Sequence, residues 1–129
     1  MVGALDILEP GGDLIIVSAC SEGIGSPEYA EAQVCLTDEG PEAFLRGIIE
    51  KKYAAVDEWQ TEMQVKAMKR ANIFLYTEGL TKEQQTLTGV TVIESPSAAV
   101  TESVKAHSDS RVAVIPEGPY VIPLFLPGI

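Results

Sequence analysis

The sequence has 129 residues and a formal net charge of -10. That length suits one domain with one core, and an acidic surface repels nucleic acids and anionic membranes, although it also simply keeps a protein in solution. Hydrophobic residues make up 46% and charged residues 22%, a globular balance rather than a disordered one. The sequence shows neither a signal peptide nor an apolar run of about 18 residues. We therefore expect a cytoplasmic protein that binds neither nucleic acid nor membrane.

The first half of the chain is predicted to form one strand and several helices. Residues 1–9 have the apolar pattern of a short helix, which the sequence PGG ends. The continuous apolar run DLIIVSAC, residues 13–20, is typical of a strand covered on both faces. Capping residues or prolines then indicate three helix starts. These lie at Ser26-Pro27, at Gly40-Pro41 and at Asp57, which has capping-box spacing with Gln60.

The second half continues the alternation of strands and helices. Strands are expected over residues 72–77, 90–93 and 111–116. A short helix after the capping pair Thr81 and Gln84, and a helix from Ser95-Pro96 to about His107, separate them. This alternation predicts an α/β fold with three layers, in which helices cover both faces of a mostly parallel sheet of about four or five strands. Residues 1–129 are expected to form a single domain.

The carboxy-terminal segment PYVIPLFLPGI, residues 119–129, is apolar and rich in proline. Apolar surface of this extent seldom stays exposed unless it docks against something. We therefore expect this domain to be part of a longer chain or to pack against a partner.

The loop CSEGIGSP, residues 20–27, is the sharpest local signal for a site. It follows the first strand, and open α/β sheets bind ligands at the carboxyl ends of their strands. Gly23 and Gly25 allow a close backbone approach, and the helix that starts at Ser26 offers free N–H groups to an anion. The loop matches neither a dinucleotide fingerprint nor a P-loop, so a tight structural turn is the alternative interpretation.

Trp59 is the only tryptophan of the sequence. Its spacing with Val56, Met63 and Ala67 favours a core position on the inward stripe of a helix. The alternative is that its ring projects from the first helical turn over a ligand, with Gln60 beside it.

His107 is the only histidine, and it lies in the polar sequence KAHSDSR at a helix end. A solvated position is favoured there, and no second histidine is present to build a metal site with it. Cys20 and Cys35 form no CxxC pair, so buried, inert thiols are expected. We assign neither catalytic residues nor metal ligands to this chain.

Four segments together resemble the carboxy-terminal domain of nickel-dependent lactate racemases. The segment LEPGGDLIIVSACSEGIGSPEY is similar to the opening of that domain, where a Pro-Gly-Gly turn leads into an apolar strand and a glycine loop. The segment VDEWQTEM resembles a helix start that carries a Trp-Gln pair in this family. The segments ANIFLYTEGL and RVAVIPEGPYVIP resemble its later strands, and the likeness runs in order through nearly the whole chain.

The resemblance implies a racemase that acts on a small 2-hydroxy acid with a nickel pincer nucleotide. In this family the acid, the base, the nickel-binding histidine and the lysine that tethers the cofactor come from an amino-terminal domain. The carboxy-terminal domain supplies the far wall of the cleft. The implied cofactor-binding residues here are Trp59, Gln60, Gly23, Gly25 and Ser26. A Gln and a Lys upstream of the Pro-Gly-Gly turn complete the family site and are not present in this sequence.

The sequence therefore favours part of an isomerase that is inactive by itself and holds no cofactor tightly without its amino-terminal domain. One histidine cannot serve as acid, base and metal ligand at once. Two alternatives remain at this point: a nucleotide- or anion-binding module that uses residues 23–26, and a non-catalytic interaction domain.

Overall fold

The computed structural model describes residues 1–126, and the last three residues of the predicted apolar tail, 127–129, lie outside the described residues. The described chain is α/β, with a parallel sheet and five α-helices. The elements follow in the order η1 Val2–Ala4, β1 Asp13–Val17, α1 Pro27–Glu39, α2 Pro41–Glu50, α3 Glu58–Met68, β2 Asn72–Tyr76, α4 Lys82–Thr86, β3 Thr91–Val92, α5 Pro96–His107 and η2 Gly118–Tyr120.

The sheet contains three parallel strands in the order β1-β2-β3 within the described residues. Strand β1 pairs with β2 along its whole length, from Asp13 opposite Asn72 to Val17 opposite Tyr76. Parallel neighbours need a crossover, and α1, α2 and α3 form the one between β1 and β2. Strand β1 ends three residues earlier than predicted, so residues 18–20 belong to the loop that follows it.

Polar side chains start three of the helices, as the sequence predicted. The hydroxyl oxygen of Ser26 accepts a hydrogen bond from the backbone N–H of Tyr29 at 3.0 Å at the start of α1. Thr81 and Gln84 form a reciprocal capping box at α4, and Ser95 caps α5. Side chains at these positions satisfy N–H groups that have no partner inside the helix.

Helices α1, α2 and α3 enclose the hydrophobic core. Leu36, Phe44 and Val65 are its buried centre, one from each helix. Partly buried apolar side chains pack around them, namely Ala32, Cys35, Leu45, Ile48 and Met68. Burial of each large apolar side chain stabilises the fold by about 1.5–3 kcal/mol, so this three-helix cluster is the main apolar support of the domain.

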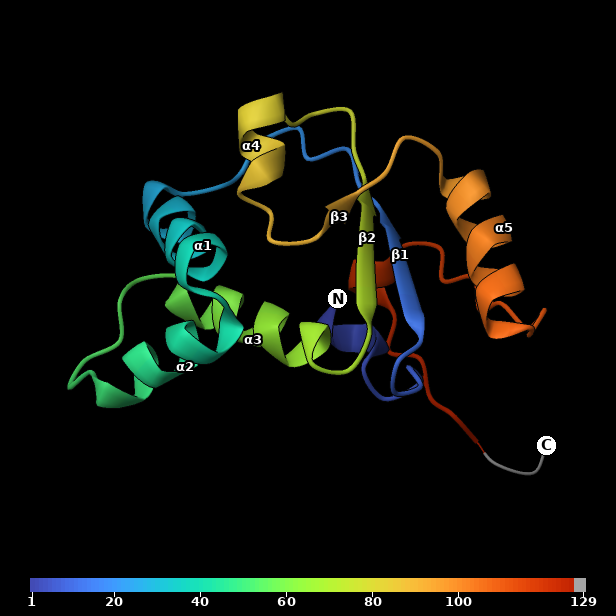
Figure 1. The fold of residues 1–129 in the computed structure, drawn as a ribbon, viewed down its shortest axis with the longest axis horizontal. Helices are drawn as coiled ribbons and strands as arrows, with labels where there is room; N and C mark the ends of the chain where they lie inside the picture. Colours follow the sequence, from blue (N-terminus) through green and yellow to red (C-terminus); the bar gives the residue numbers. More distant parts are fainter. Residues whose placement is uncertain (127–129) are drawn as a thin grey trace.

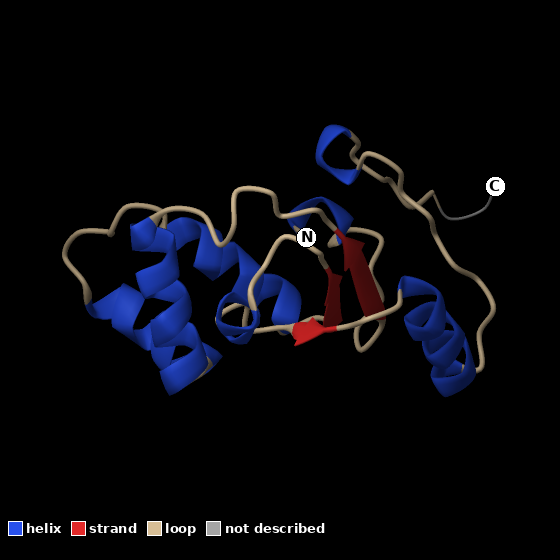
Figure 2. Cartoon of the chain, turned by 90° about the horizontal axis from the view of Figure 1, so that it is seen from above, coloured by secondary structure: helices blue, strands red, loops and turns tan. Residues whose placement is uncertain are grey.

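The three-helix cluster and α5 lie on opposite sides of the sheet. Helix α3 contacts β2, whereas α5 contacts β1, and Figures 1 and 2 show α5 apart from the other large helices. Within residues 1–126 the sheet has three strands, so the four or five that the sequence predicted are not confirmed. A full three-layer arrangement stays a prediction.

Residues 111–116 do not form the predicted strand. Their backbone is irregular, and Val114 is 83% exposed. The β-branched pattern of RVAVIP gives a preference for extended backbone, but a strand also needs an open sheet edge as its partner. The chain after α5 turns instead through Asp109, whose carboxylate accepts hydrogen bonds from the backbone and the guanidinium of Arg111.

The apolar tail is exposed along its described part. Tyr120 is 87% exposed, and Ile122, Leu124 and Phe125 are also largely open to solvent. The tail therefore adds little to the core of this domain, as the docking interpretation of the sequence requires. None of the helices in the described part of the chain is both long and apolar enough to cross a bilayer.

Gly79 allows the loop after β2 to lie directly against the loop after β1. A Cβ atom at this position would collide with the backbone carbonyl oxygens of Ala19 and Cys20. The same contact is held by Thr77, whose hydroxyl donates to the carbonyl of Ala19 at 3.3 Å and accepts from the N–H of Gly79 at 3.3 Å. Close packing of two backbones is one of the uses of glycine.

We predict that Gly79→Ala destabilises the domain by about 2–4 kcal/mol, because neither backbone segment can move aside cheaply. The matched control is Gly47→Ala in α2, where a Cβ atom meets open space and a helix interior favours alanine. This control should raise the unfolding free energy by about 0.5–1 kcal/mol. Urea denaturation measures both variants, and equal midpoints for the two would contradict the close-contact role of Gly79.

Candidate functional site

The loop after β1 is a tight turn shaped by two glycines. Gly23 has a φ angle of 69° and Gly25 one of 102°, both in the region that favours glycine. The N–H of Gly23 donates to the carbonyl of Cys20 at 3.0 Å, which closes the turn. The side-chain amide of Gln84 in α4 lies beside Gly23, where a Cβ atom would be 3.0 Å from its nitrogen. Figure 1 shows the loop passing next to α4 on its way to α1.

Ser26 ends this loop and makes two contacts at once. Its hydroxyl caps α1 by accepting from Tyr29 and donates to the carboxylate oxygen Oδ2 of Asp57 at 2.7 Å. The second contact connects the first loop of the sheet to the start of α3. The structure thus brings Ser26 to a part of the chain that is distant in sequence.

Asp57 carries a second hydrogen bond on its other carboxylate oxygen. The side-chain amide nitrogen of Gln60 donates to Oδ1 of Asp57 at 2.9 Å. Two predicted site residues, Ser26 and Gln60, therefore meet through Asp57, a residue that the sequence analysis had assigned only to helix capping. The predicted capping role is wrong within the described structure: Asp57 has a left-handed backbone with a φ angle of 60°, and its side chain caps no N–H group of α3.

Trp59 is exposed at the first turn of α3, next to Gln60. It is 63% exposed, so the core position that its spacing favoured is wrong. The reason is that Val56 precedes the helix and does not share its phase. The buried face of α3 contains Glu58, Thr61, Gln64, Val65 and Ala67 and is mostly polar. The predicted stripe shares only Ala67 with this face, because a stripe based on hydrophobicity alone does not identify buried polar residues. The exposure of Trp59 is compatible with the alternative that its ring projects over a ligand, which stays a prediction.

Comparison with protein families shows which family this chain matches. The lactate racemase C-terminal domain family matches residues 1–123, nearly the whole sequence. This chain belongs to that family. The resemblance of the four sequence segments is thereby confirmed. A search of curated protein sequences found no match.

A buried polar network supports this lactate racemase-type domain behind the exposed residues. The side-chain amide nitrogen of Gln33 in α1 donates to the hydroxyl of Thr61 at 3.0 Å and to the carbonyl oxygen of Gln64 at 3.1 Å. Gln64 donates in turn to the backbone carbonyl of Thr88 at 2.6 Å. The oxygen Oε1 of Gln33 has no hydrogen-bond partner among the described residues. The network fixes α1 against α3, and both against the segment before β3.

Tyr29 connects the network to the glycine loop. Its hydroxyl donates to Gln64 at 3.4 Å, a long hydrogen bond, and its backbone N–H is capped by Ser26. Burial raises the pKa of the Tyr29 phenol, and the nearby Cys20 side chain adds to the rise. Tyr29 therefore stays a neutral donor at neutral pH.

Glu58, the residue before Trp59 in the sequence, is a buried carboxylate. Its side chain is 6% exposed, and it forms an ion pair with Lys51 and accepts a hydrogen bond from the backbone N–H of Ala55 at 3.0 Å. Burial alone would raise the pKa of Glu58. The hydrogen bonds from Lys51 and Ala55 and the positive charge of Lys51 lower the pKa by more than burial raises it, so the pKa lies below its ordinary value of 4.5. These contacts hold the segment that precedes α3 in place.

His107 is engaged at the amino end of β1, away from the glycine loop. Its Nε2 atom lies 3.2 Å from Oδ2 of Asp13, and Asn72 donates to the other oxygen of that carboxylate at 2.8 Å. Burial raises the pKa of Asp13, but hydrogen bonds from Asn72 and Ser103 and the interaction with His107 outweigh it, so the net pKa is lowered. The partner Asp13 was not anticipated for this histidine, because it comes from the far end of the sequence.

The two cysteines are not brought together with this histidine. Burial raises the pKa of the Cys35 thiol, and Glu39 raises it further, which favours an inert thiol. Cys20 lies in the glycine loop with a φ angle of 47°, and its thiol lies 3.5 Å from the hydroxyl of Ser18. Across residues 1–126, no three side chains of His, Cys, Asp or Glu are grouped so that they could hold a metal ion.

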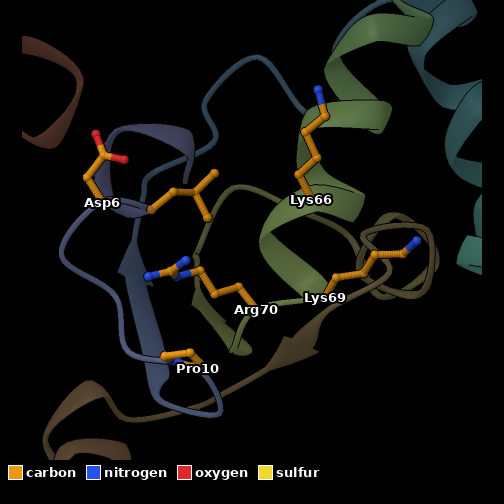
Figure 3. Close-up of a pocket in the computed structure, with 6 residues that line it drawn as sticks. Asp6, Pro10, Lys66, Lys69 and Arg70 are labelled. Atoms are coloured by element: carbon orange, nitrogen blue, oxygen red, sulfur yellow. The ribbon is translucent and has the colours of Figure 1, made fainter.

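A cavity lies elsewhere, at the amino end of the strands. It has a volume of about 440 Å³ and sits between the amino-terminal segment and the end of α3. Its lining residues are Leu5, Asp6, Pro10, Lys66, Lys69 and Arg70. Figure 3 shows Arg70 reaching toward Pro10 and Lys69 pointing away from Asp6. The basic side chains therefore do not converge on one point, and Lys66 is already paired with Glu62 at 3.1 Å.

We predict that Glu58 makes the domain sensitive to acid. A carboxyl group whose folded pKa is below its unfolded value contributes stability above the unfolded pKa, and this stability is lost as the pH falls through the folded pKa. Glu58→Gln should lower the unfolding free energy by about 1–3 kcal/mol at pH 7. Between about pH 5 and pH 3, the unfolding free energy of this variant should fall less than that of the wild type, because glutamine does not titrate.

Lys51→Met provides the companion test, because it removes the main donor and leaves the buried carboxylate with one partner. The acid transition of this variant should move to higher pH than in the wild type. Urea denaturation at a series of pH values measures all three proteins. Superimposable pH profiles for the wild type and Glu58→Gln would rule out the ion pair as a source of acid sensitivity.

Proposed function

We propose that this chain forms one wall of a cleft that holds a nickel pincer nucleotide and a small 2-hydroxy acid. It would act as the carboxy-terminal domain of a racemase or epimerase, with an amino-terminal domain of the same parent protein as its partner. The observation that carries this proposal is the joined unit of Ser26, Asp57 and Gln60, which presents the exposed Trp59 beside it. The family membership supports the same role.

The unit suits the wall of a cofactor cleft in its chemistry. Trp59 offers a flat aromatic face, which attracts a positively charged ring such as a pyridinium. Gln60 uses one N–H group on Asp57 and keeps its carbonyl oxygen and a second N–H for a ligand. Gly23, Gly25 and Ser26 lie on the loop joined to this unit at the carboxyl side of β1, where sheets of this class bind ligands.

The acid-base groups are proposed to come from the partner domain. Racemisation at a carbinol carbon needs an acid and a base on opposite faces of that carbon. The single histidine of this chain is bound to Asp13 at the start of β1, whereas the glycine loop follows the end of that strand. The start and the end of β1 lie roughly 13 Å apart, because each further residue of a strand adds about 3.3 Å.

The donor set of this chain does not fit nickel. Cys20, Cys35 and His107 lie in separate places, and imidazole and thiolate are the ligands that nickel favours. We therefore propose no nickel ligand from this chain. The bound nucleotide would supply a hydride acceptor, while this domain would contribute the contact surface.

A direct anion-binding role for residues 23–26 is the weaker proposal. The carboxylate of Asp57 lies 2.7 Å from the hydroxyl of Ser26, at the amino terminus of α1 where a phosphate would bind. A fixed negative charge at this point repels a second anion. The space next to Gly23 is also taken by Gln84. A non-catalytic interaction module explains the exposed tail, but it gives no reason for the joined unit beside Trp59.

The proposal predicts activity only when both domains are present. The chain is mixed with the cofactor-loaded amino-terminal part of a lactate racemase that includes the Gln and Lys segment upstream of the Pro-Gly-Gly turn. Interconversion of D- and L-lactate is followed by chiral chromatography. The mixture should show turnover, and the chain alone should show none. Trp59→Ala should lower the turnover of the mixture roughly 10- to 100-fold, since a small loss of cofactor alignment has effects of this size.

Tyr53→Ala is the matched control, because Tyr53 is another exposed aromatic residue but lies outside the joined unit. Its turnover should equal that of the wild type. Turnover by the chain alone, no turnover in the mixture, or undiminished turnover in Trp59→Ala would each count against the proposed wall.

A further inference from the structure

The side chain of Asp57 joins the glycine loop to the start of α3. Its two carboxylate oxygens accept from different partners, Ser26 at 2.7 Å and Gln60 at 2.9 Å. Ser26 is 31 positions away in sequence, so this contact is tertiary, whereas the contact with Gln60 lies within one helical turn. Hydrogen bonds to an ionised carboxylate are about twice as strong as neutral ones and hold geometry well.

The backbone conformation of Asp57 indicates that its hydrogen bonds with the side chains of Ser26 and Gln60 are favoured over ordinary capping of α3. Asp57 has a φ angle of 60° and a ψ angle of -1°, in the left-handed region. An aspartate before a helix normally adopts extended backbone and caps the N–H groups of the first turn. Here the carboxylate caps no backbone N–H group of α3 and accepts from the side chains of Ser26 and Gln60 instead. A strained residue persists only where its surroundings hold it in place.

In the sequence, Trp59 lies between Asp57 and Gln60, which are joined by a side-chain hydrogen bond. Residues 57 and 60 are bonded to each other through their side chains, and the N–H of Gln60 also donates to the backbone carbonyl of Asp57 at 3.0 Å. The first turn of α3 is therefore closed on itself and fixed to the loop through Ser26. This turn carries the exposed side chain of Trp59.

We infer that Asp57 is a positioning residue that locks the first turn of α3, with Trp59 and Gln60, against the glycine loop. The two elements then present a single rigid surface instead of two that move independently. The importance of Asp57 for turnover rests on the proposed function. The hydrogen bonds from Ser26 and Gln60 to Asp57 are a property of this chain and are tested without a ligand. Preorganisation of this kind lowers the entropy lost when a ligand binds.

Three variants test the inference. Asp57→Gly removes the carboxylate and keeps a residue that suits the left-handed backbone. Asp57→Asn restores both contacts, because its oxygen accepts from Gln60 and its amide donates to the hydroxyl of Ser26. Ser108→Gly is the matched control, since Ser108 is also a non-glycine residue with positive φ, at 53°, but lies at the end of α5.

The main measurement is the side-chain amide signal of Gln60 in a ¹⁵N–¹H NMR spectrum, assigned by its loss in Gln60→Glu. We expect a distinct, slowly exchanging amide pair in the wild type, in Asp57→Asn and in Ser108→Gly. In Asp57→Gly the pair should move to the position of a free glutamine, while the signals of the helical core stay in place. The amplitude of fast Trp59 motion in fluorescence anisotropy decay should rise in the same variant.

An unchanged Gln60 signal in Asp57→Gly would overturn the inference, and so would a failure of Asp57→Asn to restore it. If Asp57→Gly does not fold, Ser26→Ala is measured in its place. This variant increases the fast motion of Trp59 only if the hydrogen bond between Ser26 and Asp57 holds the first turn of α3. Turnover of the two-domain mixture separates the two claims. A freed Gln60 with full turnover contradicts the role of Asp57 in the reaction, whereas a wild-type mixture without turnover contradicts the proposed function alone.

Discussion

The packing of α1 against α3 through buried amides is the constraint on which the site depends. Gln33 is fully buried and donates to Thr61 and Gln64, which fixes the rotation of α3 relative to α1. With that rotation fixed, the start of α1 faces the start of α3, and Ser26 comes within 2.7 Å of Asp57. An unpaired buried polar group costs about 1–3 kcal/mol, so a slip of either helix breaks several contacts at a high cost. The polar core therefore specifies one register where apolar packing would tolerate several.

The same constraint explains the exposed apolar surface around Trp59. Because Glu58, Thr61 and Gln64 fill the inward face of α3, Trp59 at its first turn is left on the outward side. The apolar side chains of the tail, from Tyr120 to Leu126, are also exposed. A domain with buried polar residues and exposed aromatic ones is suited to meet a second surface, which agrees with the proposed position against an amino-terminal domain.

The sequence predicted local structure well because local structure depends on neighbouring residues. Ser26, Thr81 and Ser95 cap helices where the sequence placed them, and Gly23 and Gly25 lie in a tight turn after the first strand, with positive φ angles. The failures concern contacts between distant residues. The burial of Trp59, the strand at 111–116 and the role of Asp57 all depend on which partner lies opposite, and no local pattern contains that information. The family motifs led to Trp59 and Gln60, whereas Asp57 became visible only through its distances to Ser26 and Gln60.

The environment of Trp59 in the presence of the partner domain tests the central claim most directly. Trp59 is the only tryptophan of this chain, so 5-fluorotryptophan places a single ¹⁹F label at the proposed wall. The label should show a solvent-exposed signal in the chain alone, since the side chain is 63% exposed. Addition of the cofactor-loaded amino-terminal domain should shift this signal and remove its sensitivity to D₂O, and the domain without cofactor should have a smaller effect. A signal that stays exposed and unchanged while the two domains bind would contradict the account, because Trp59 would then face away from the cleft.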